Sequence, residues 1–408
     1  MRISSNMSVV LLAFIGIILS GCDNKNSHSS VNLKTCDTTL WTVDANNWKM
    51  NLGRDGYWGQ NPALLWGGYF RNGTVIFAGG IFVGAVKNGN PAVSSVHFIS
   101  DFASGIISNT TVAAIEEMKI SDANHACQYI IDQTESGEDW LHWPISLGAP
   151  MDGGGHPLLI SAMDSWTVYH DADSSKRLYN GVAGILGVEV RQSTYMFVQS
   201  QYNGLEDVLF MHWRVTNKSN NDYSNAYIAL WNDPDVNNGG ARDLVASDTA
   251  RNMIYVYNDS AAAVTKDVVG YQLLYFSGTN GINARPHATI WYHKTSDEGN
   301  DMTWQYNLMK GLKGDGTIRS DGDPNQPTFD FPGDPITKTG IIQTQAFDKQ
   351  ILSSVGPFTF TAGETHEIIF AIIGSEGTGR DDAIAKLRTS ADNVKTVFKN
   401  QVAALLGL

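Results

Sequence analysis

The chain has 408 residues, with 41 acidic and 28 basic side chains, which gives a formal net charge of −13 at pH 7. This excess of acid, without any cluster of Lys or Arg, argues against nucleic acids and anionic lipid surfaces as charge-driven partners. The 40 glycines, together with 11 Trp, 15 Tyr and 16 Phe, indicate tight turns between aromatic-rich strands.

The first residues, MRISSNMSVVLLAFIGIILSGC, have the order of a secretory signal. Arg2 supplies a positive charge, and an apolar run followed by small residues leads to Cys22. The run is shorter than the about 20 apolar residues that cross a bilayer, so it does not predict a membrane span. Its end, LSGC at residues 19–22, resembles the lipobox of bacterial lipoproteins, which implies removal of residues 1–21 and lipid attachment at Cys22. An ordinary signal peptide that ends near a Cys is the alternative.

Residues 22–37 are predicted to be the acylated Cys and a polar tether. From Asp23 to Lys34 the chain is rich in Ser and Asn, which favours a flexible link between a lipid and a folded domain. Asp23 after the acylated Cys resembles the signal that retains lipoproteins of enteric bacteria in the inner membrane. No later segment is apolar for long enough to span a bilayer. We therefore expect a lipid-anchored protein of the bacterial cell envelope, in the periplasm or at the cell surface.

Cys36 and Cys127 are the cysteines that remain after Cys22. In an oxidising compartment two such residues most simply form a disulfide, which would join the start of the domain to a distant segment. Two free buried thiols are the alternative. Neither residue has a CxxC or Cys/His metal spacing, so neither redox catalysis nor zinc binding is indicated.

The stretch ESGEDWLHWPISLGAPMDGGGHP, from Glu135, concentrates acids and histidines around Trp140 and Trp143. An enzyme would use a carboxylate and a His from such a stretch as acid and base in an aromatic-lined cleft. The alternative, which we favour, is an ordered loop whose Trp residues fill the core. The next polar stretch, VYHDADSSKR, has no spacing that fixes the geometry of its side chains. The candidate residues of the two stretches are Glu138, Asp139, His142, His156, His170, Asp171 and Asp173.

Short apolar stretches separated by Gly, Asn, Asp and Pro recur along the chain and predict a mainly β protein. The spacing between them leaves no room for helical crossovers, so it favours an antiparallel β-sandwich over a parallel sheet. We expect one large sandwich or two lobes, an N-terminal one at 38–200 and a C-terminal one at 201–408. In VLFMHWRVTNKS, from Val208, alternation predicts a half-buried strand. Its apolar face is Leu209, Met211, Trp213 and Val215.

The stretch LWNDPDVNNGGARDLVASD, residues 230–248, places Asp and Asn on a Gly-rich loop after an apolar strand. Calcium takes about six to eight oxygen ligands and tolerates irregular loops, so we expect a structural Ca²⁺ site here. The EF-hand pattern is absent, because Asn238 holds its sixth position and Leu244 its twelfth. A solvated turn and a catalytic or sugar-binding acid are the alternatives. The expected ligands are Asp233, Asp235, Asn237, Asp243 and Asp248.

An amphipathic helix is expected at the C-terminus, beginning near Asp381 and Asp382, whose charge suits the positive end of the helix dipole. A shorter helix is expected over MTWQYNLMKGL, ended by Gly311. A partner-binding helix is the alternative, but the C-terminal helix is predicted to pack across a sheet face, because its apolar residues recur at steps of three and four. They are Ile384, Leu387, Ala391, Val394, Phe398, Val402 and Leu405.

Several phrases, taken in order, resemble a family of secreted bacterial surface proteins that has no assigned reaction. They are LWGGYFRNGTVIFAGGIFVGAVKNG, DWLHWPISLGAP, RVTNKSNNDYSNAYIALWNDPD, IYVYND, VGYQLLYF, DFPGDPITKTG and SSVGPFTFTAGETHEIIFAIIGSEG. The resemblance runs roughly from Trp48 to Phe398 and implies an acidic loop at residues 230–248 but no activity. Many members have an Asp/Gly-rich insertion where this chain has the short APMDGGGHPLL, so no metal loop is expected there. Many also end in a sorting domain, whereas this chain is expected to use Cys22.

We therefore expect a lipid-anchored extracytoplasmic β-sandwich with a binding or surface-structural role, stabilised by calcium. Its expected partners are the membrane, through the lipid, and a polysaccharide or a surface protein. The alternative is a polysaccharide-active hydrolase or lyase that uses acids near Asp139 or Asp235. A cleft with converging carboxylates or a Tyr/His pair would favour the enzyme, and a flat aromatic platform or an exposed apolar patch would favour binding.

Overall fold

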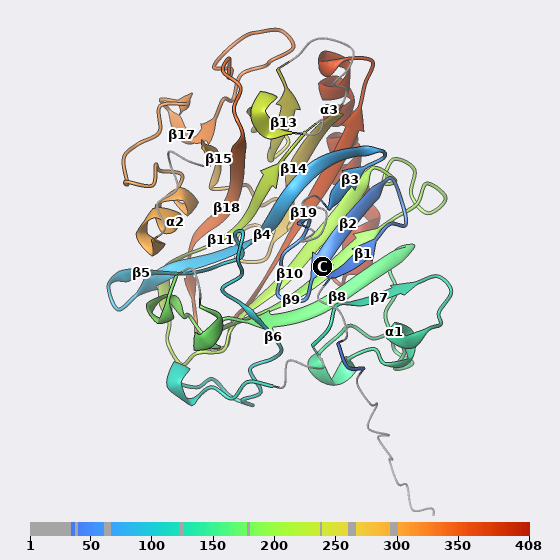
Figure 1. The fold of residues 1–408 in the computed structure, drawn as a ribbon, viewed down its shortest axis with the longest axis vertical. Helices are drawn as coiled ribbons and strands as arrows, with labels where there is room; N and C mark the ends of the chain where they lie inside the picture. Colours follow the sequence, from blue (N-terminus) through green and yellow to red (C-terminus); the bar gives the residue numbers. More distant parts are fainter. Residues whose placement is uncertain are drawn as a thin grey trace, which may run out of the picture. The chain divides into compact units, whose positions relative to one another are not determined.

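Two large β-sheets face each other in the computed structural model, which describes residues 34–36, 40–60, 67–121, 126–177, 180–236, 239–259, 267–293 and 301–408 (Figure 1). The predicted signal peptide, the predicted lipid attachment site Cys22, most of the predicted tether and Asn237 lie outside these residues. Residues 33–408 form one compact unit. The predicted mainly β fold with antiparallel sheets is confirmed.

The first sheet has ten strands within the described residues. All neighbouring strands pair antiparallel except β15 and β17, which form a parallel pair. In spatial order they are β1 (Leu40–Val43), β2 (Trp48–Gly53), β3 (Gly68–Phe70), β4 (Gly73–Lys87), β11 (Tyr223–Pro234), β18 (Lys349–Phe360), β15 (Ala288–His293), β17 (Gln326–Asp330) and β16 (Gly322–Asp323), with β5 (Asn90–Ser95) beside β4.

The second sheet has nine strands within the same residues, all paired antiparallel. In spatial order they are β12 (Asp243–Asp248), β13 (Met253–Asn258), β14 (Asp267–Phe276), β19 (Thr365–Glu376), β10 (Val208–Asn217), β9 (Val188–Met196), β8 (Met163–His170) and β6 (Ala103–Ser104), with β7 (Tyr129–Asp132) beside β8.

Strands from both sides of residue 200 contribute to both sheets. β4 pairs with β11 in the first sheet, and β9 pairs with β10 in the second. The boundary between the two expected lobes, 38–200 and 201–408, therefore falls between two strands that are hydrogen-bonded to each other.

The main core lies between the two sheets. The alternation in β10 places Leu209, Met211, Trp213 and Val215 in this core, as predicted. The Trp213 ring lies 5.7 Å from that of Trp58, measured between centroids. Phe210 points to the opposite face of the same strand, where it belongs to a second apolar cluster.

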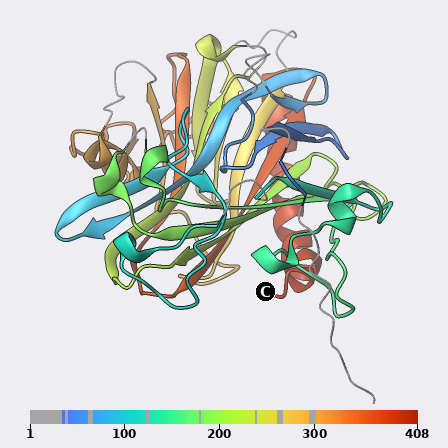
Figure 2. The same cartoon turned by 60° about the horizontal axis from the view of Figure 1, so that its bottom comes forward.

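The C-terminal helix covers part of the outer face of the second sheet (Figure 2). It comprises α3 (Arg380–Val397), a π-helical turn at Phe398–Val402 and α4 (Ala403–Leu405). Every predicted contact residue is buried except Leu405, which is 44% exposed. The predicted shorter helix is α2 (Met302–Met309), which packs on the outer face of the first sheet.

Short helical turns occupy the connections. They are α1 (Glu138–Leu141), η1 (Ile115–Glu117), η3 (Ile145–Leu147), η4 (Ser174–Lys176), η5 (Val182–Gly184) and η6 (Gly240–Arg242). Among the described residues, no helix is both long enough and apolar enough to cross a membrane.

Cys36 and Cys127 form a disulfide, with their α-carbons 5.4 Å apart. Cys127 is fully buried beside Tyr129, Trp143 and Trp166. The disulfide thus fastens the segment before β1 to the segment before β7.

Candidate metal site

Three carboxylates meet at one end of the first sheet. One oxygen each from Asp233, Asp235 and Asp348 lies within 4.8 Å of the others. We call these three residues the acidic cluster. Two of them belong to the acidic loop that the sequence singled out, and the third comes from a distant part of the chain.

The pairing of β11 with β18 brings the cluster together. Asn232 lies opposite Ile351 in this antiparallel pair, so continuing the register places Asp235 opposite Asp348. A shift in register between Asp233 and Pro234 interrupts the pairing of β11 with β4 at the same point. Such irregularities redirect side chains at a strand end, and here they accompany the turn of the chain into the loop.

The loop then returns over the cluster at η6. Gly240 is buried, and a methyl group on its α-carbon would lie 2.6 Å from Asp235 Oδ1 and 2.9 Å from Asp348 Oδ1. Only a residue without a side chain leaves these two oxygens undisturbed.

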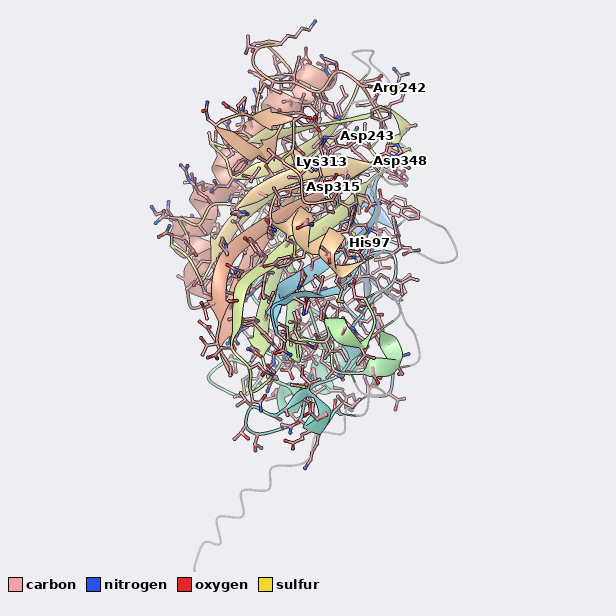
Figure 3. The ribbon with its side chains drawn as sticks, turned by 90° about the vertical axis from the view of Figure 1, so that its left-hand side faces the viewer. His97, Arg242, Asp243, Lys313, Asp315 and Asp348 are labelled. Carbon is pink, nitrogen blue, oxygen red and sulfur yellow. A yellow bond between two sulfur atoms is a disulfide. The ribbon has the colours of Figure 1, made fainter. Side chains whose placement is uncertain are left out.

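Asp243 begins β12 beside the cluster and is fully buried. Its Oδ2 accepts a hydrogen bond of 3.2 Å from the Val236 amide. Its Oδ1, like Asp348 Oδ1, is buried without a hydrogen-bond partner among the described residues. Buried carboxylate oxygens are normally satisfied, so these two oxygens have capacity for a further ligand. Asp243 and Asp348 appear at the same end of the molecule in Figure 3.

Burial raises the pKa of Asp243 well above its ordinary value, and the charges of Asp235 and Asp348 raise it further. Lys349 lies beside them and donates hydrogen bonds to the carbonyl oxygens of Asp243 and Phe347. Burial lowers the pKa of Lys349 to about 8, although the nearby carboxylates oppose this shift. The site thus holds four carboxyl groups, of which Asp243 and Asp348 act electrostatically on the single ammonium group of Lys349. That imbalance suits a divalent cation with oxygen ligands, such as Ca²⁺.

One predicted ligand, Asp248, lies elsewhere. Asp248 is at the far end of β12, where it forms an ion pair of 2.8 Å with Arg251 and lies 3.7 Å from Arg388. Asp348 was not among the predicted ligands. Its acidic character at the start of an apolar strand was visible, but its pairing with the end of β11 was not.

Most of the candidates before residue 180 make contacts within the fold. Asp139 accepts hydrogen bonds from Lys34 and from the Ile130 amide, and Asp171 accepts bonds from Ser94 and from the Leu186 and Val188 amides. Asp173 caps η4 through the Ser175 amide. Glu138 pairs with His142 and Asp152 pairs with His156 over short range, and Trp143 packs in the core as expected.

A separate cavity of about 380 Å³ is lined by Asp55 and Tyr57, which follow β2 of the first sheet, and by two residues that the sequence singled out, His170 and Asp173. The Asp55 Oδ1 atom is buried without a hydrogen-bond partner among the described residues. Burial raises the pKa of Asp55 to about 6, even though Arg54 and Lys176 act in the opposite direction. Asp55 was not among the residues that the sequence singled out.

No family model and no curated protein matches the sequence. Among solved structures, a bacterial glucoamylase complexed with acarbose has a TM-score of 0.37 at 10% identity, over 91% of this chain. This chain spans 39% of the length of that glucoamylase. A protein from Escherichia coli K12 described as an aldose 1-epimerase has a TM-score of 0.34 at 7% identity, over 83% of this chain and 99% of the other. A copper-containing benzylamine oxidase from Hansenula polymorpha has a TM-score of 0.34 at 9% identity, and the match covers 89% of this chain and 65% of the oxidase chain. At these TM-scores the activities of the three proteins do not indicate an activity for this chain.

Proposed function

We propose that this chain is a lipid-anchored, extracytoplasmic β-sandwich protein whose acidic cluster holds a structural Ca²⁺ ion. Asp233, Asp235 and Asp348 would supply carboxylate oxygens to the ion, and Asp243 a fourth. The observation that carries the proposal is the convergence of these acids from two separate strands around the buried Gly240. The ion would offset a buried negative charge that Lys349 offsets only in part.

The proposed location is the bacterial cell envelope, with the membrane reached through a lipid on Cys22. The sequence LSGC supports the anchor, and the Cys36–Cys127 disulfide supports an oxidising compartment. In this position the domain would serve a binding or surface-structural role towards a polysaccharide or another surface protein. Replacement of Cys22 by Ala should release the protein from the membrane fraction; retention there would contradict the anchor.

Thermal unfolding of the form that begins at Asp23 tests the calcium site. A ligand that binds the folded state alone stabilises it by about 2.7 kcal/mol at a concentration 100 times its dissociation constant. We therefore expect the melting temperature to rise with millimolar Ca²⁺ and to fall with a chelator. The Asp235→Ala and Asp348→Ala variants should lose this response.

Asp248→Ala is the matched control, because it removes an acid from the same stretch but outside the acidic cluster. It should lower the melting temperature equally with calcium and with chelator. An unchanged melting temperature in the wild type, or a calcium response that survives Asp348→Ala, would contradict the site.

A further inference from the structure

A second pocket lies on the outer face of the second sheet, beyond the area that the C-terminal helix covers. Its volume is about 120 Å³. The floor is formed by side chains of the neighbouring strands β8, β9, β10 and β19, and the walls by residues 148–160 and by Leu406 at the chain end. The polar residues of the floor are Arg191, Ser193, Tyr195, His212, Arg214 and Glu367.

Two guanidinium groups stand side by side in this floor. Arg191 and Arg214 are directly opposite each other in the pairing of β9 with β10, and Glu367 is opposite Arg214 on the next strand. Like charges directly opposite on adjacent strands repel each other. An anion that contacts both groups would remove this repulsion.

Each guanidinium has one carboxylate partner and N–H donors to spare. Arg191 Nη2 lies 3.3 Å from Glu189 Oε1, and Arg214 Nε lies 3.0 Å from Glu367 Oε1. Arg191 Nε is buried without a hydrogen-bond partner among the described residues. A guanidinium has five N–H donors, so both groups can bind a further oxygen ligand. Gly148 in the wall makes room for Arg191, because a methyl group there would lie 2.5 Å from the guanidinium carbon.

A chain of hydrogen bonds holds Glu367 at the edge of the pocket. His212 Nε2 lies 3.2 Å from Glu367 Oε2, and His212 Nδ1 lies 3.2 Å from the Tyr195 hydroxyl. With the His212 proton on Nε2, the imidazole donates to Glu367 and accepts from Tyr195. Both ring nitrogens are then engaged inside the protein. The Tyr/His pair therefore positions Glu367 and is not itself a free acid or base for a substrate.

The protonation states fit this arrangement. Burial raises the pKa of Glu367, but the His212 hydrogen bond and the Arg214 charge outweigh burial and hold that pKa below its ordinary value. Burial, with the Asp164 charge, raises the pKa of Tyr195, so its hydroxyl keeps its proton at neutral pH. Glu367 is thus an ionised acceptor beside two cationic donors.

We propose that this pocket binds the carboxylate end of a sugar acid, such as a uronic acid unit. The carboxylate would bridge Arg191 and Arg214, and a hydroxyl on a neighbouring carbon would donate to Glu367. The cavity has room for about four water molecules at roughly 30 Å³ each, which matches a carboxylate and the atoms next to it rather than a whole polymer. The inference rests on the proposed binding role and names its ligand. It does not require calcium, so either proposal can fail alone.

The experiment is isothermal titration of the full chain in detergent with glucuronate, galacturonate and, as the uncharged counterpart, glucose. At least one uronate should bind at least ten times more tightly than glucose. Arg191→Gln and Arg214→Gln should each weaken uronate binding at least tenfold, and Arg214→Lys, which keeps the charge but not the fork of donors, should weaken it less. Arg285→Gln, an exposed arginine in the turn before β15, is the control and should bind as the wild type does.

Three results would overturn the proposal. They are binding of neither uronate, equal binding of glucose, and undiminished uronate binding by Arg214→Gln. The comparison of uronate with glucose uses the wild-type protein, so it decides the question even if a variant does not fold.

Discussion

Asp235, just after β11, and Asp348, just before β18, approach the same point, the position that a side chain on Gly240 would occupy. Neither carboxylate oxygen is more than 2.9 Å from the position that a methyl group on Gly240 would occupy. The glycine is therefore as much a part of the acidic cluster as the acids are. It sets how closely the loop can lie over them.

Replacement of Gly240 by Ala should weaken calcium binding while leaving every carboxylate in place. The new methyl group would displace the Asp235 and Asp348 side chains. We therefore expect the affinity for calcium to be at least tenfold weaker, as measured from the melting temperature at increasing calcium concentrations. Gly153→Ala is the matched control, because a methyl group there meets no atom within 4 Å. Equal calcium responses of the two variants would contradict the role of Gly240.

Asp55→Asn should change how stability depends on pH. The pKa of Asp55 is about 6 in the folded state and about 3.8 in the unfolded state, so between these values the folded state binds more protons. The stabilisation that protonated Asp55 gives the folded state is fully present below about pH 4. The free energy of unfolding then falls as pH rises towards about 6. The amide side chain of the Asp55→Asn variant does not ionise, so its free energy of unfolding does not fall in this way as pH rises. The variant should be more stable than the wild type at pH 7 by about 1–3 kcal/mol, and equally stable at pH 4. Urea denaturation at both pH values checks this, and parallel profiles would contradict it.

Removal of the disulfide should lower stability substantially. The bond joins residues that are 91 positions apart, so its loss should cost about 4 kcal/mol through the entropy of the unfolded chain. We expect the double variant Cys36→Ala and Cys127→Ala to unfold at a markedly lower urea concentration. The wild type treated with a reducing agent is the control and should approach the variant. Coincident curves for variant and untreated wild type would show that the bond contributes nothing.

Leu387→Ala should destabilise the contact between α3 and the second sheet. Leu387 is fully buried and lies above Gly270 of β14, where the missing side chain leaves room for it. Truncation of a buried leucine costs about 2–5 kcal/mol, whereas truncation of the exposed Lys395 should change stability by less than about 0.5 kcal/mol. Chemical denaturation measures both. Equal effects would mean that the helix does not depend on this contact.

Periodicity in the sequence predicted much of the fold. The alternation from Leu209 to Val215 gave the correct inner face of β10, and the spacing from Ile384 to Val402 gave the buried face of the C-terminal helix. Both patterns arise from local geometry, so a single segment is enough to reveal them. The order of strands across two sheets is a property of distant pairs, and no segment carries it alone.

The same limit applies to the two sites. Asp233 and Asp235 share a short loop and were found together, whereas Asp348 joins them only through the pairing of β11 with β18. His212 and Arg214 alternate along β10 with the predicted apolar residues and so lie on its opposite face. Their partners are on β9 and β19, which the sequence could not place beside them. A site whose residues come from several strands can be recognised only when the pairing register of those strands is known.

The position of Cys36 also has a mechanical consequence. β1 is an edge strand, held by its pairing with β2 alone among the described strands. A pull on the chain ahead of residue 36 would peel such a strand away one hydrogen bond at a time. Because the disulfide lies before β1, the pulling force is transmitted through a covalent bond to Cys127. It then acts on the cluster of buried aromatic residues that surrounds Cys127. A force applied ahead of Cys36 would therefore not act directly on the edge strand β1.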